Sequence, residues 1–250
     1  MTGEESLREN WNRKAEDWHR QIGVEGDRNR QLRLGPVARK WLGDTRGLCT
    51  LDAGCGTGWM AGMLAEMGSQ VTAVDFSEEM VRVTERSMRE RSLPVATRVD
   101  DCSSLVSCRD LEFDIVTSIY VLQDLPDLDG ALSSFYRVLK PSGTCLLAFS
   151  HPCFGVPGGS SQEEGQTVYR WPHGYFSSER MTEVWLGTDH QTKEKFSFQD
   201  EFVYFHRPLH EYWKAFRRAG FVVLELEEPF PSGEERKAMP YPMMVYLKKP

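Results

Sequence analysis

Short apolar segments alternate with amphipathic segments through most of the chain, and this pattern predicts strands and helices in turn. The predicted strands are 48–53, 70–75, 95–100, 113–119, 143–150, 221–226 and 243–247, and the predicted helices are 58–68, 77–91, 103–107, 128–139 and 207–219. Such alternation is typical of a parallel sheet covered by helices on both faces. We therefore expect an α/β fold with a doubly wound, mostly parallel seven-stranded sheet that includes an antiparallel C-terminal strand.

The first 46 residues have helical spacing rather than strand spacing. Apolar side chains recur at steps of three and four residues, as on one face of a helix: Leu7, Trp11, Ala15 and Trp18. Glycines within 21–27 break this helix, and 28–42 resumes helical character. Residues 1–46 therefore form a helical arm. Its tryptophans either pack on the core or cover a ligand pocket as a lid, and both interpretations stay open.

Residues 151–206 interrupt the alternating pattern. This segment is rich in proline and glycine, shows little helical periodicity and is too long for a plain connection. We expect an inserted cap with short strands of its own, which divides the core into 47–150 and 207–250. The cap aromatics either line a substrate pocket or form a small core of their own: Tyr169, Trp171, Tyr175, Phe176 and Trp185.

A glycine-rich stretch, 51–58, separates the first predicted strand from the helix after it. Gly54 can adopt dihedrals that a Cβ would forbid, Gly56 lets the backbone approach a ligand, and Gly58 lets the helix pack closely. The next strand ends in Asp75, and an acid at about this spacing commonly binds ribose hydroxyls. A purely structural turn followed by an unrelated acid is the alternative.

The string Asp52-Ala53-Gly54-Cys55-Gly56-Thr57-Gly58 resembles the first motif of class I S-adenosylmethionine-dependent methyltransferases. Further segments resemble the small-molecule members of that family: Lys140-Pro141-Ser142-Gly143, His206-Arg207-Pro208-Leu209, Ala219-Gly220-Phe221 and Glu227-Glu228-Pro229. The resemblance implies a Rossmann-like fold, S-adenosylmethionine as the cofactor and methyl transfer to a small molecule. A dinucleotide site would favour the spacing G-x-G-x-x-G, which disfavours a nicotinamide oxidoreductase.

The resemblance also implies which residues hold the cofactor. The glycine loop would hold its methionine part, Asp75 its ribose and Asp101 the adenine amino group, with Asp100 as the competing acid. Phe76 either stacks on adenine or packs in the core. The expected cofactor-binding residues are Asp52, Ala53, Gly54, Cys55, Gly56, Gly58, Asp75, Phe76, Asp101, Cys102, Ile119 and Tyr120.

His151 is the candidate base because it directly follows the fifth strand, at the carboxyl edge where ligands of open α/β sheets bind. Its alternative is a structural histidine that holds the cap. The family often has a histidine after the leucine of its fourth motif, whereas here Leu122 is followed by Gln123 and Asp124. Methyl transfer can also proceed by alignment alone, because a sulfonium is already an activated donor.

Candidate substrate contacts come from the arm, the fourth strand and the cap: Trp18, Tyr120, Trp171, Tyr175 and His206. His206 and His210 have a spacing that could seat a metal ion, but no third ligand is evident. We therefore expect no metal site, and a capping role for this pair.

Composition narrows the range of functions. The chain has 250 residues with 37 acidic and 30 basic side chains, so a formal net charge of −7 and scattered bases argue against nucleic acid as a partner. Six cysteines without a C-x-x-C pair, together with the lack of a signal peptide or apolar span, predict a cytoplasmic protein with no membrane partner. We expect a monomer or a homodimer. Non-methylating chemistry such as a cyclisation, and a non-catalytic subunit that activates a partner enzyme, are the functional alternatives.

Overall fold

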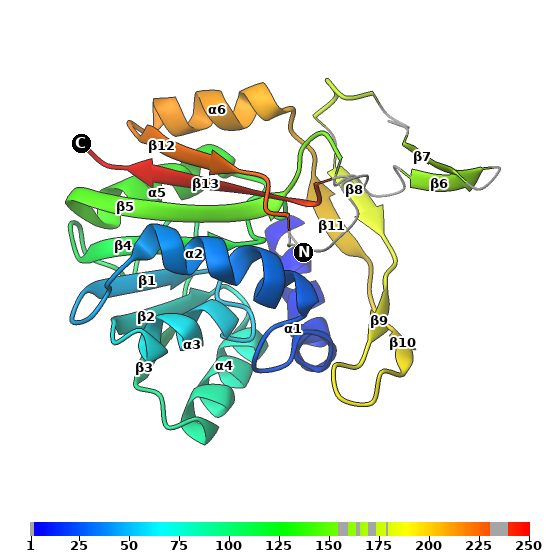
Figure 1. The fold of residues 1–250 in the computed structure, drawn as a ribbon, viewed down its shortest axis with the longest axis horizontal. Helices are drawn as coiled ribbons and strands as arrows, with labels where there is room; N and C mark the ends of the chain where they lie inside the picture. Colours follow the sequence, from blue (N-terminus) through cyan, green and yellow to red (C-terminus); the bar gives the residue numbers. More distant parts are fainter. Residues whose placement is uncertain (1–2, 155–159, 164–165, 170–173, 179, 231–239) are drawn as a thin grey trace.

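A computed structural model describes residues 3–154, 160–163, 166–169, 174–178, 180–230 and 240–250 (Figure 1). A seven-stranded sheet in the order β12-β13-β5-β4-β1-β2-β3 forms its centre. Its strands are β1 (Cys49–Ala53), β2 (Gln70–Asp75), β3 (Val95–Val99), β4 (Phe113–Ile119), β5 (Leu139–Ser150), β12 (Val222–Glu227) and β13 (Pro242–Lys248). Only β13 among these seven runs antiparallel to its neighbours, as the sequence pattern predicted.

Helices cover both faces of the sheet. The described helices are α1 (Gly3–Ile22), α2 (Gly35–Leu42), α3 (Trp59–Glu66), α4 (Glu78–Glu90), α5 (Leu128–Val138) and α6 (Leu209–Arg218), with a π-helical turn η1 (Arg30–Leu34) before α2. Apolar residues of α5 and α6 pack on one face, and those of α2 and α3 pack on the other. The β-branched and aliphatic residues of the central strands are buried between these layers, which explains their continuous apolar runs.

The inserted segment contains short strands, as expected. They form three two-stranded antiparallel pairs: β6 (Ser160–Glu163) with β7 (Gln166–Tyr169), β8 (Arg180–Glu183) with β11 (Phe202–Phe205), and β9 (Leu186–Thr188) with β10 (Lys195–Ser197). In Figure 1, β8 to β11 stand beside α1, at the edge of the sheet where the parallel strands end. An ion pair from Arg20 to Asp189, 2.6 Å long, joins α1 to this insertion.

Two sequence predictions differ from the structure. Residues 103–107 form turns rather than a helix, because the Asp100 carboxylate accepts the backbone N–H groups of Val106 and Ser107, at 3.2 and 2.7 Å. Those amides would otherwise bond to helix carbonyls. The strand predicted over 143–150 begins at Leu139, so the Lys140-Pro141-Ser142-Gly143 segment lies within β5. No helix of the described residues is long and apolar enough to cross a bilayer.

Candidate functional site

The loop between β1 and α3 has a left-handed backbone at each of its three glycines. Gly54 has φ +74°, and a Cβ there would lie 2.3 Å from Val121. Gly56 has φ +53°, and its nearest neighbour in the direction of a Cβ is Trp18 Nε1 at 3.8 Å. Gly54 therefore allows close packing of two loops, whereas Gly56 leaves open space in front of its backbone.

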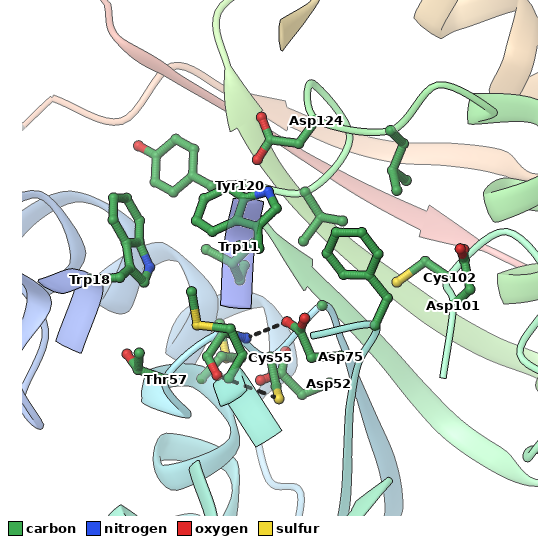
Figure 2. A pocket seen from close by; sticks show the side chains of 18 of the residues that line it. Trp11, Trp18, Asp52, Cys55, Thr57, Asp75, Asp101, Cys102, Tyr120 and Asp124 are labelled. Carbon is green, nitrogen blue, oxygen red and sulfur yellow. Dashed lines mark hydrogen bonds between the residues drawn. The ribbon is translucent and has the colours of Figure 1, made fainter. Parts of the chain in front are cut away.

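Asp75 joins this loop to the end of β2. Its Oδ2 accepts the N–H of Gly56 at 2.9 Å, and its Oδ1 accepts the N–H of Ser77 at 3.0 Å (Figure 2). Burial raises the pKa of Asp75 to about 6, and the two amides oppose that rise. Each carboxylate oxygen has a second lone pair, so the group can still accept ligand hydroxyls.

Asp52 ends β1 beneath the loop and is almost fully buried. Its Oδ1 accepts the hydroxyl of Thr117 at 3.0 Å, while Oδ2 is buried without a well-formed hydrogen bond. Burial raises the pKa of Asp52 to about 7, although Thr117 and the amide of Ala61 lower it. A buried carboxylate oxygen without a partner is costly, so this atom is a candidate contact for a cationic ligand.

The two adjacent acids after β3 have different positions. Asp100 is tied into its own loop through several amides and the Ser107 hydroxyl, which lies 2.5 Å from Asp100 Oδ2. Asp101 instead lines the cavity described below, as does Cys102. The structure therefore distinguishes two acids that the sequence left as competitors.

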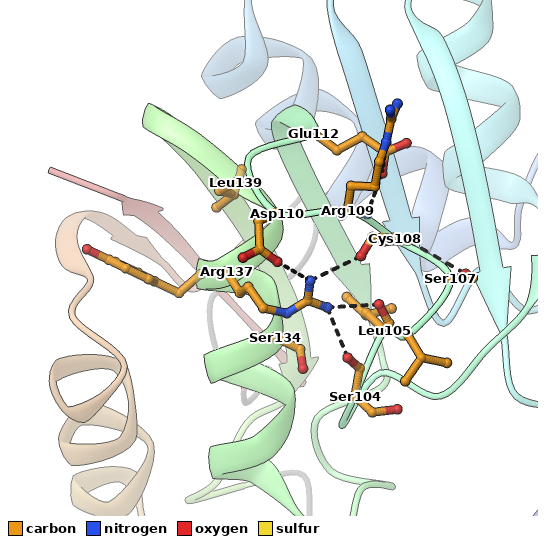
Figure 3. Close-up of polar contacts among 12 residues, drawn as sticks. Ser104, Leu105, Ser107, Cys108, Arg109, Asp110, Glu112, Ser134, Arg137 and Leu139 are labelled. Carbon is orange, nitrogen blue, oxygen red and sulfur yellow. Dashed lines mark hydrogen bonds and ion pairs between the residues drawn. The ribbon is translucent and has the colours of Figure 1, made fainter.

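Arg137 of α5 holds that loop from outside (Figure 3). Its guanidinium donates to the carbonyls of Ser104, Leu105 and Cys108 at 2.8–3.0 Å and pairs with Asp110 at 2.6 Å. The position of Asp101 and Cys102 thus depends on a helix that follows them in the chain.

A cavity of about 1120 Å³, including its mouth, extends from the glycine loop to the loop after β4. Figure 2 shows the side chains of α1 on one side of it and the ends of the strands on the other. The lining residues come from α1, η1, and the loops after β1, β2, β3 and β4: Leu7, Trp11, Trp18, Ile22, Arg30, Asp52, Gly54, Cys55, Gly56, Thr57, Trp59, Met60, Asp75, Phe76, Met80, Asp101, Cys102, Ser103, Ile119, Tyr120, Val121, Asp124, Leu125, Pro126 and Asp127.

Most of the residues proposed for the cofactor meet in this cavity. Ala53 and Gly58 are the exceptions. Ala53 is completely buried within the sheet, and a Cβ on Gly58 would meet Thr84 of α4 at 3.0 Å. Both residues therefore shape the loop from behind rather than face the cavity. Phe76 lines the cavity, so the purely core-packed alternative does not describe it.

The arm both covers the cavity and packs on the insertion. Trp11 and Trp18 line the cavity, and each ring lies 5.7 Å from the ring of Phe202 in β11. Tyr120 faces the same space with φ +58°, and its phenol accepts a hydrogen bond from Asn29. The tryptophans of the arm thus contact the insertion as well as the cavity, and the role of the arm as a lid stays a prediction.

His151 lies elsewhere, outside the cavity lining. It is buried, its Nε2 lies 2.7 Å from Glu228, and its Nδ1 accepts the N–H of Cys153 at 3.1 Å. Burial lowers the pKa of His151, and Glu228 opposes that change. Since both ring nitrogens have protein partners, the geometry does not support the interpretation of His151 as a base.

The cap residues proposed for substrate contact are also outside the cavity lining. The Tyr175 hydroxyl accepts the N–H of Leu209 at 2.8 Å, and His206 Nε2 lies 2.8 Å from the Tyr175 carbonyl. Trp171 lies outside the described residues. The described residues hold no cluster of three metal-ligating side chains. His210 contacts Glu211 at 2.9 Å.

Several cavity residues were not anticipated from the sequence. Arg30 is buried, pairs with Asp27 at 2.9 Å and lies 5.4 Å from the ring of Tyr120. Asp124 belongs to the loop after β4, two residues after Leu122, and Gln123 occupies the place where the family often has histidine. Among the described lining residues five are aspartates and one, Arg30, is basic, so the cavity favours a cationic ligand.

Comparisons with known proteins agree with this architecture. Residues 51–147 match a family model described as "Methyltransferase domain". A ubiquinone biosynthesis O-methyltransferase from Xanthomonas oryzae pv. oryzae is 35% identical over 118 residues, which cover 46% of this chain and 49% of that protein. The chain thus aligns with about half the length of the curated relatives it matches.

Solved structures share the fold over nearly the whole chain. An S-adenosylmethionine-dependent methyltransferase from Mesorhizobium loti superposes with a TM-score of 0.70 at 21% identity, covering 90% of this chain and 100% of that one. Magnesium protoporphyrin IX methyltransferase from Synechocystis, solved with bound S-adenosylmethionine, has a TM-score of 0.63 at 16% identity, with 100% and 98% coverage.

Proposed function

We propose that the chain is a class I methyltransferase that transfers a methyl group from S-adenosylmethionine to a small molecule, and the match of residues 51–147 to a methyltransferase domain supports this. The cofactor would occupy the cavity wall from the glycine loop to Asp101. The segment 1–46 would serve as a lid, residues 47–150 and 207–250 as the cofactor-binding core, and residues 151–206 as a cap that supports the lid.

The backbone and acids of this wall fit the cofactor. Asp75 can accept from both ribose hydroxyls while keeping its bonds to Gly56 and Ser77. Asp101 lines the same cavity and would accept from the adenine amino group. The open space before Gly56 is where a ligand can approach the backbone closely.

The charge of the cavity favours S-adenosylmethionine over a nicotinamide cofactor. S-adenosylmethionine bears a sulfonium and an ammonium against one carboxylate, so its net charge is positive, whereas the diphosphate of a nicotinamide cofactor is negative. The buried Oδ2 of Asp52, which lacks a well-formed hydrogen bond, and the excess of aspartates favour the positive S-adenosylmethionine and repel a negative diphosphate. This acidic wall is the single observation on which the proposal rests.

The remaining space would hold the acceptor. It is bounded by Trp11, Trp18 and Tyr120, whose rings suit a flat or apolar molecule. The similarity to an O-methyltransferase makes oxygen the first acceptor atom to consider. When bound, the cofactor supplies an activated methyl group, and the chain positions the acceptor in line and excludes water with α1.

Calorimetric titration tests the cofactor assignment. The protein should bind S-adenosylmethionine and should not bind NAD. Asp75→Asn should weaken binding by about 1.5–3 kcal/mol, the range for loss of a charged hydrogen-bond partner. Asp129→Asn is the matched control, because Asp129 is an exposed acid that pairs with Arg218 and does not line the cavity. Binding of NAD alone, or equal affinity in Asp75→Asn and wild type, would contradict the proposal.

A further inference from the structure

Asp124 is a cavity acid that the cofactor does not need. It lies on the loop after β4, and Figure 2 shows its carboxylate at the opposite end of the view from Asp52 and Asp75. In that view the ring of Trp11 is drawn between Asp124 and the pair Asp52 and Asp75, and the ring of Tyr120 is drawn beside Asp124. Asp124 therefore belongs to the part of the cavity left for the acceptor.

The loop that carries Asp124 is fixed by hydrogen bonds within itself. The N–H of Asp124 donates to the carbonyl of Val121 at 2.8 Å, and the side-chain amide of Gln123 donates to the carbonyl of Tyr120 at 2.7 Å. The Gln123 carbonyl accepts the N–H of Phe205 at 2.7 Å, which joins the loop to β11 of the insertion.

Arg207, which directly follows the insertion in the chain, fixes the same loop. Its guanidinium donates to the carbonyls of Leu122, Leu125 and Pro126 at 3.2, 2.6 and 3.0 Å. The carbonyls that accept these bonds come before and after Asp124 in the sequence. A carboxylate on a loop held in this way is preorganised, which is what a group that contacts a reacting atom requires.

A buried lysine of α1 interacts electrostatically with this carboxylate. Lys14 has no solvent exposure, its ammonium donates to the carbonyl of Glu201 at 2.7 Å, and it lies 4.0 Å from the ring centre of Phe202. A buried ammonium is costly unless a negative charge compensates it. Asp124 provides that charge, since the two groups interact electrostatically.

The surroundings of Asp124 adjust its proton affinity. Burial raises the pKa of Asp124 well above its ordinary value, and Lys14 opposes that rise. Burial likewise lowers the pKa of Lys14 to about 8. The phenols of Tyr204 on β11, Tyr212 on α6 and Tyr241 before β13 also interact with Asp124. A base with a raised pKa is better matched to neutral pH than an ordinary carboxylate.

We propose that Asp124 is the general base for a hydroxyl acceptor, and that Lys14 is a positioning residue that keeps it ionised. This inference rests on the proposed function. The acceptor O–H bond breaks and its proton passes to the Asp124 carboxylate. The acceptor oxygen gains the methyl group as the sulfonium C–S bond breaks, with that electron pair remaining on sulfur. The protonated Asp124 then releases its proton to solvent when the product leaves.

Flat hydroxyl compounds are the probes that the aromatic walls suggest: phenol, catechol and resorcinol. Wild-type protein should methylate at least one of them. Asp124→Asn keeps the shape of the side chain but cannot accept the proton, so kcat should fall by roughly 10²–10⁴-fold. S-adenosylmethionine affinity, measured by calorimetry, should stay within about twofold. Asp129→Asn is the control that should retain wild-type kcat.

Lys14 variants separate a positioning role from a merely structural one. Lys14→Met removes the charge, so the Asp124 pKa rises and the acid limb of kcat/KM should move up by about one pH unit. Lys14→Arg keeps the charge and should restore the wild-type profile. An unchanged acid limb in Lys14→Met would remove Lys14 from the proposal.

A second measurement needs no turnover. Difference infrared spectra of wild type against Asp124→Asn, both saturated with S-adenosylhomocysteine, should show a carboxylic acid band that disappears as the pH rises. Quenching of tryptophan fluorescence by catechol should strengthen as that band disappears, because Trp11 and Trp18 line the cavity.

The outcomes distinguish this inference from the proposed function. Failure to bind S-adenosylmethionine overturns the function itself. With the cofactor bound normally, the base assignment is overturned if Asp124→Asn loses less than about tenfold in kcat, or if Asp124 remains protonated at pH 8. Methylation of aniline but of no hydroxyl probe, or of no probe at all, overturns the hydroxyl acceptor.

Discussion

At the scale of single residues, adjacent and chemically identical side chains have different roles because their partners differ. The Asp100 carboxylate accepts hydrogen bonds from amides of its own loop, whereas the neighbouring Asp101 lines the cavity. Gly54 and Gly56 differ in the same way, since one abuts Val121 and the other faces open space.

Alanine at these two glycines should give opposite results. Gly54→Ala forces a Cβ against Val121 and should lower the free energy of unfolding by about 1–3 kcal/mol. Gly56→Ala should lower the free energy of unfolding by only about 1–2 kcal/mol, because alanine is strained in a left-handed backbone. It should nevertheless weaken cofactor binding at least tenfold, because the added methyl group projects into the cavity. Urea unfolding and calorimetry on both variants check this, and equal effects on binding would contradict it.

Replacement of His151 tests the base that the sequence suggested. Its ring bonds to Glu228 and Cys153 lie outside the cavity lining, so His151→Gln should reduce turnover less than about tenfold. Loss of the two bonds should lower the unfolding free energy by about 1–3 kcal/mol. A loss of 10² or more in kcat with unchanged stability would instead restore His151 as the base.

At the scale of elements, the loops at the carboxyl edge are held by residues distant in sequence. Arg137 on α5 fixes the loop after β3, and Arg207 fixes the loop after β4. The insertion reaches the cavity through the bond from the Phe205 N–H of β11 to the Gln123 carbonyl in the loop after β4, rather than by contributing described lining residues.

Arg137→Met should loosen the loop that carries Asp101 and Cys102. Removing four hydrogen bonds to the loop should weaken S-adenosylmethionine binding about five- to tenfold and lower stability by about 1–3 kcal/mol. Arg218→Met is the matched control, because the ion pair of Arg218 with Asp129 is exposed at the surface. Faster amide exchange confined to residues 101–110 would confirm the cause, and unchanged exchange there would exclude it.

At the scale of the whole molecule, the buried carboxylates of the cavity destabilise the folded protein when they are ionised, and a cationic ligand would compensate their charge. Asp52 and Asp75 have pKa values of about 7 and 6 in the folded protein, above the roughly 3.9 of an unfolded aspartate. At pH values between the unfolded pKa and the folded pKa, the folded state therefore binds more protons than the unfolded state. The contribution of these groups to stability is complete below about pH 4 and is lost as pH rises through 6 and 7.

Melting temperatures measured with and without ligand test this coupling. The Tm of the free protein should fall between pH 5 and pH 8, while the increase caused by S-adenosylmethionine should grow. At about 100 times Kd the ligand should add about 2.7 kcal/mol at pH 8. Asp52→Asn should raise the ligand-free Tm at pH 8 and reduce the gain from ligand. A ligand-induced increase that is larger at pH 5 than at pH 8 would contradict the electrostatic account.

The sequence determined the features that depend on neighbouring residues. The order of strands and helices, the glycine loop and the acid at the end of β2 could be predicted, because apolar periodicity and glycine spacing act locally. Most of the expected cofactor residues line one cavity because parallel strands end at the same edge of a sheet.

Only the tertiary structure decided the features that depend on distant partners. The turns at 103–107 form because Asp100 and Arg137 satisfy the backbone in place of a helix. Asp124 lines the cavity and interacts electrostatically with Lys14, which lies more than a hundred residues earlier in the chain. His151 instead lies against Glu228, outside the cavity lining. The sequence specifies the chemistry of each side chain. The contacts that form when the chain folds determine which of its atoms remain available to a ligand.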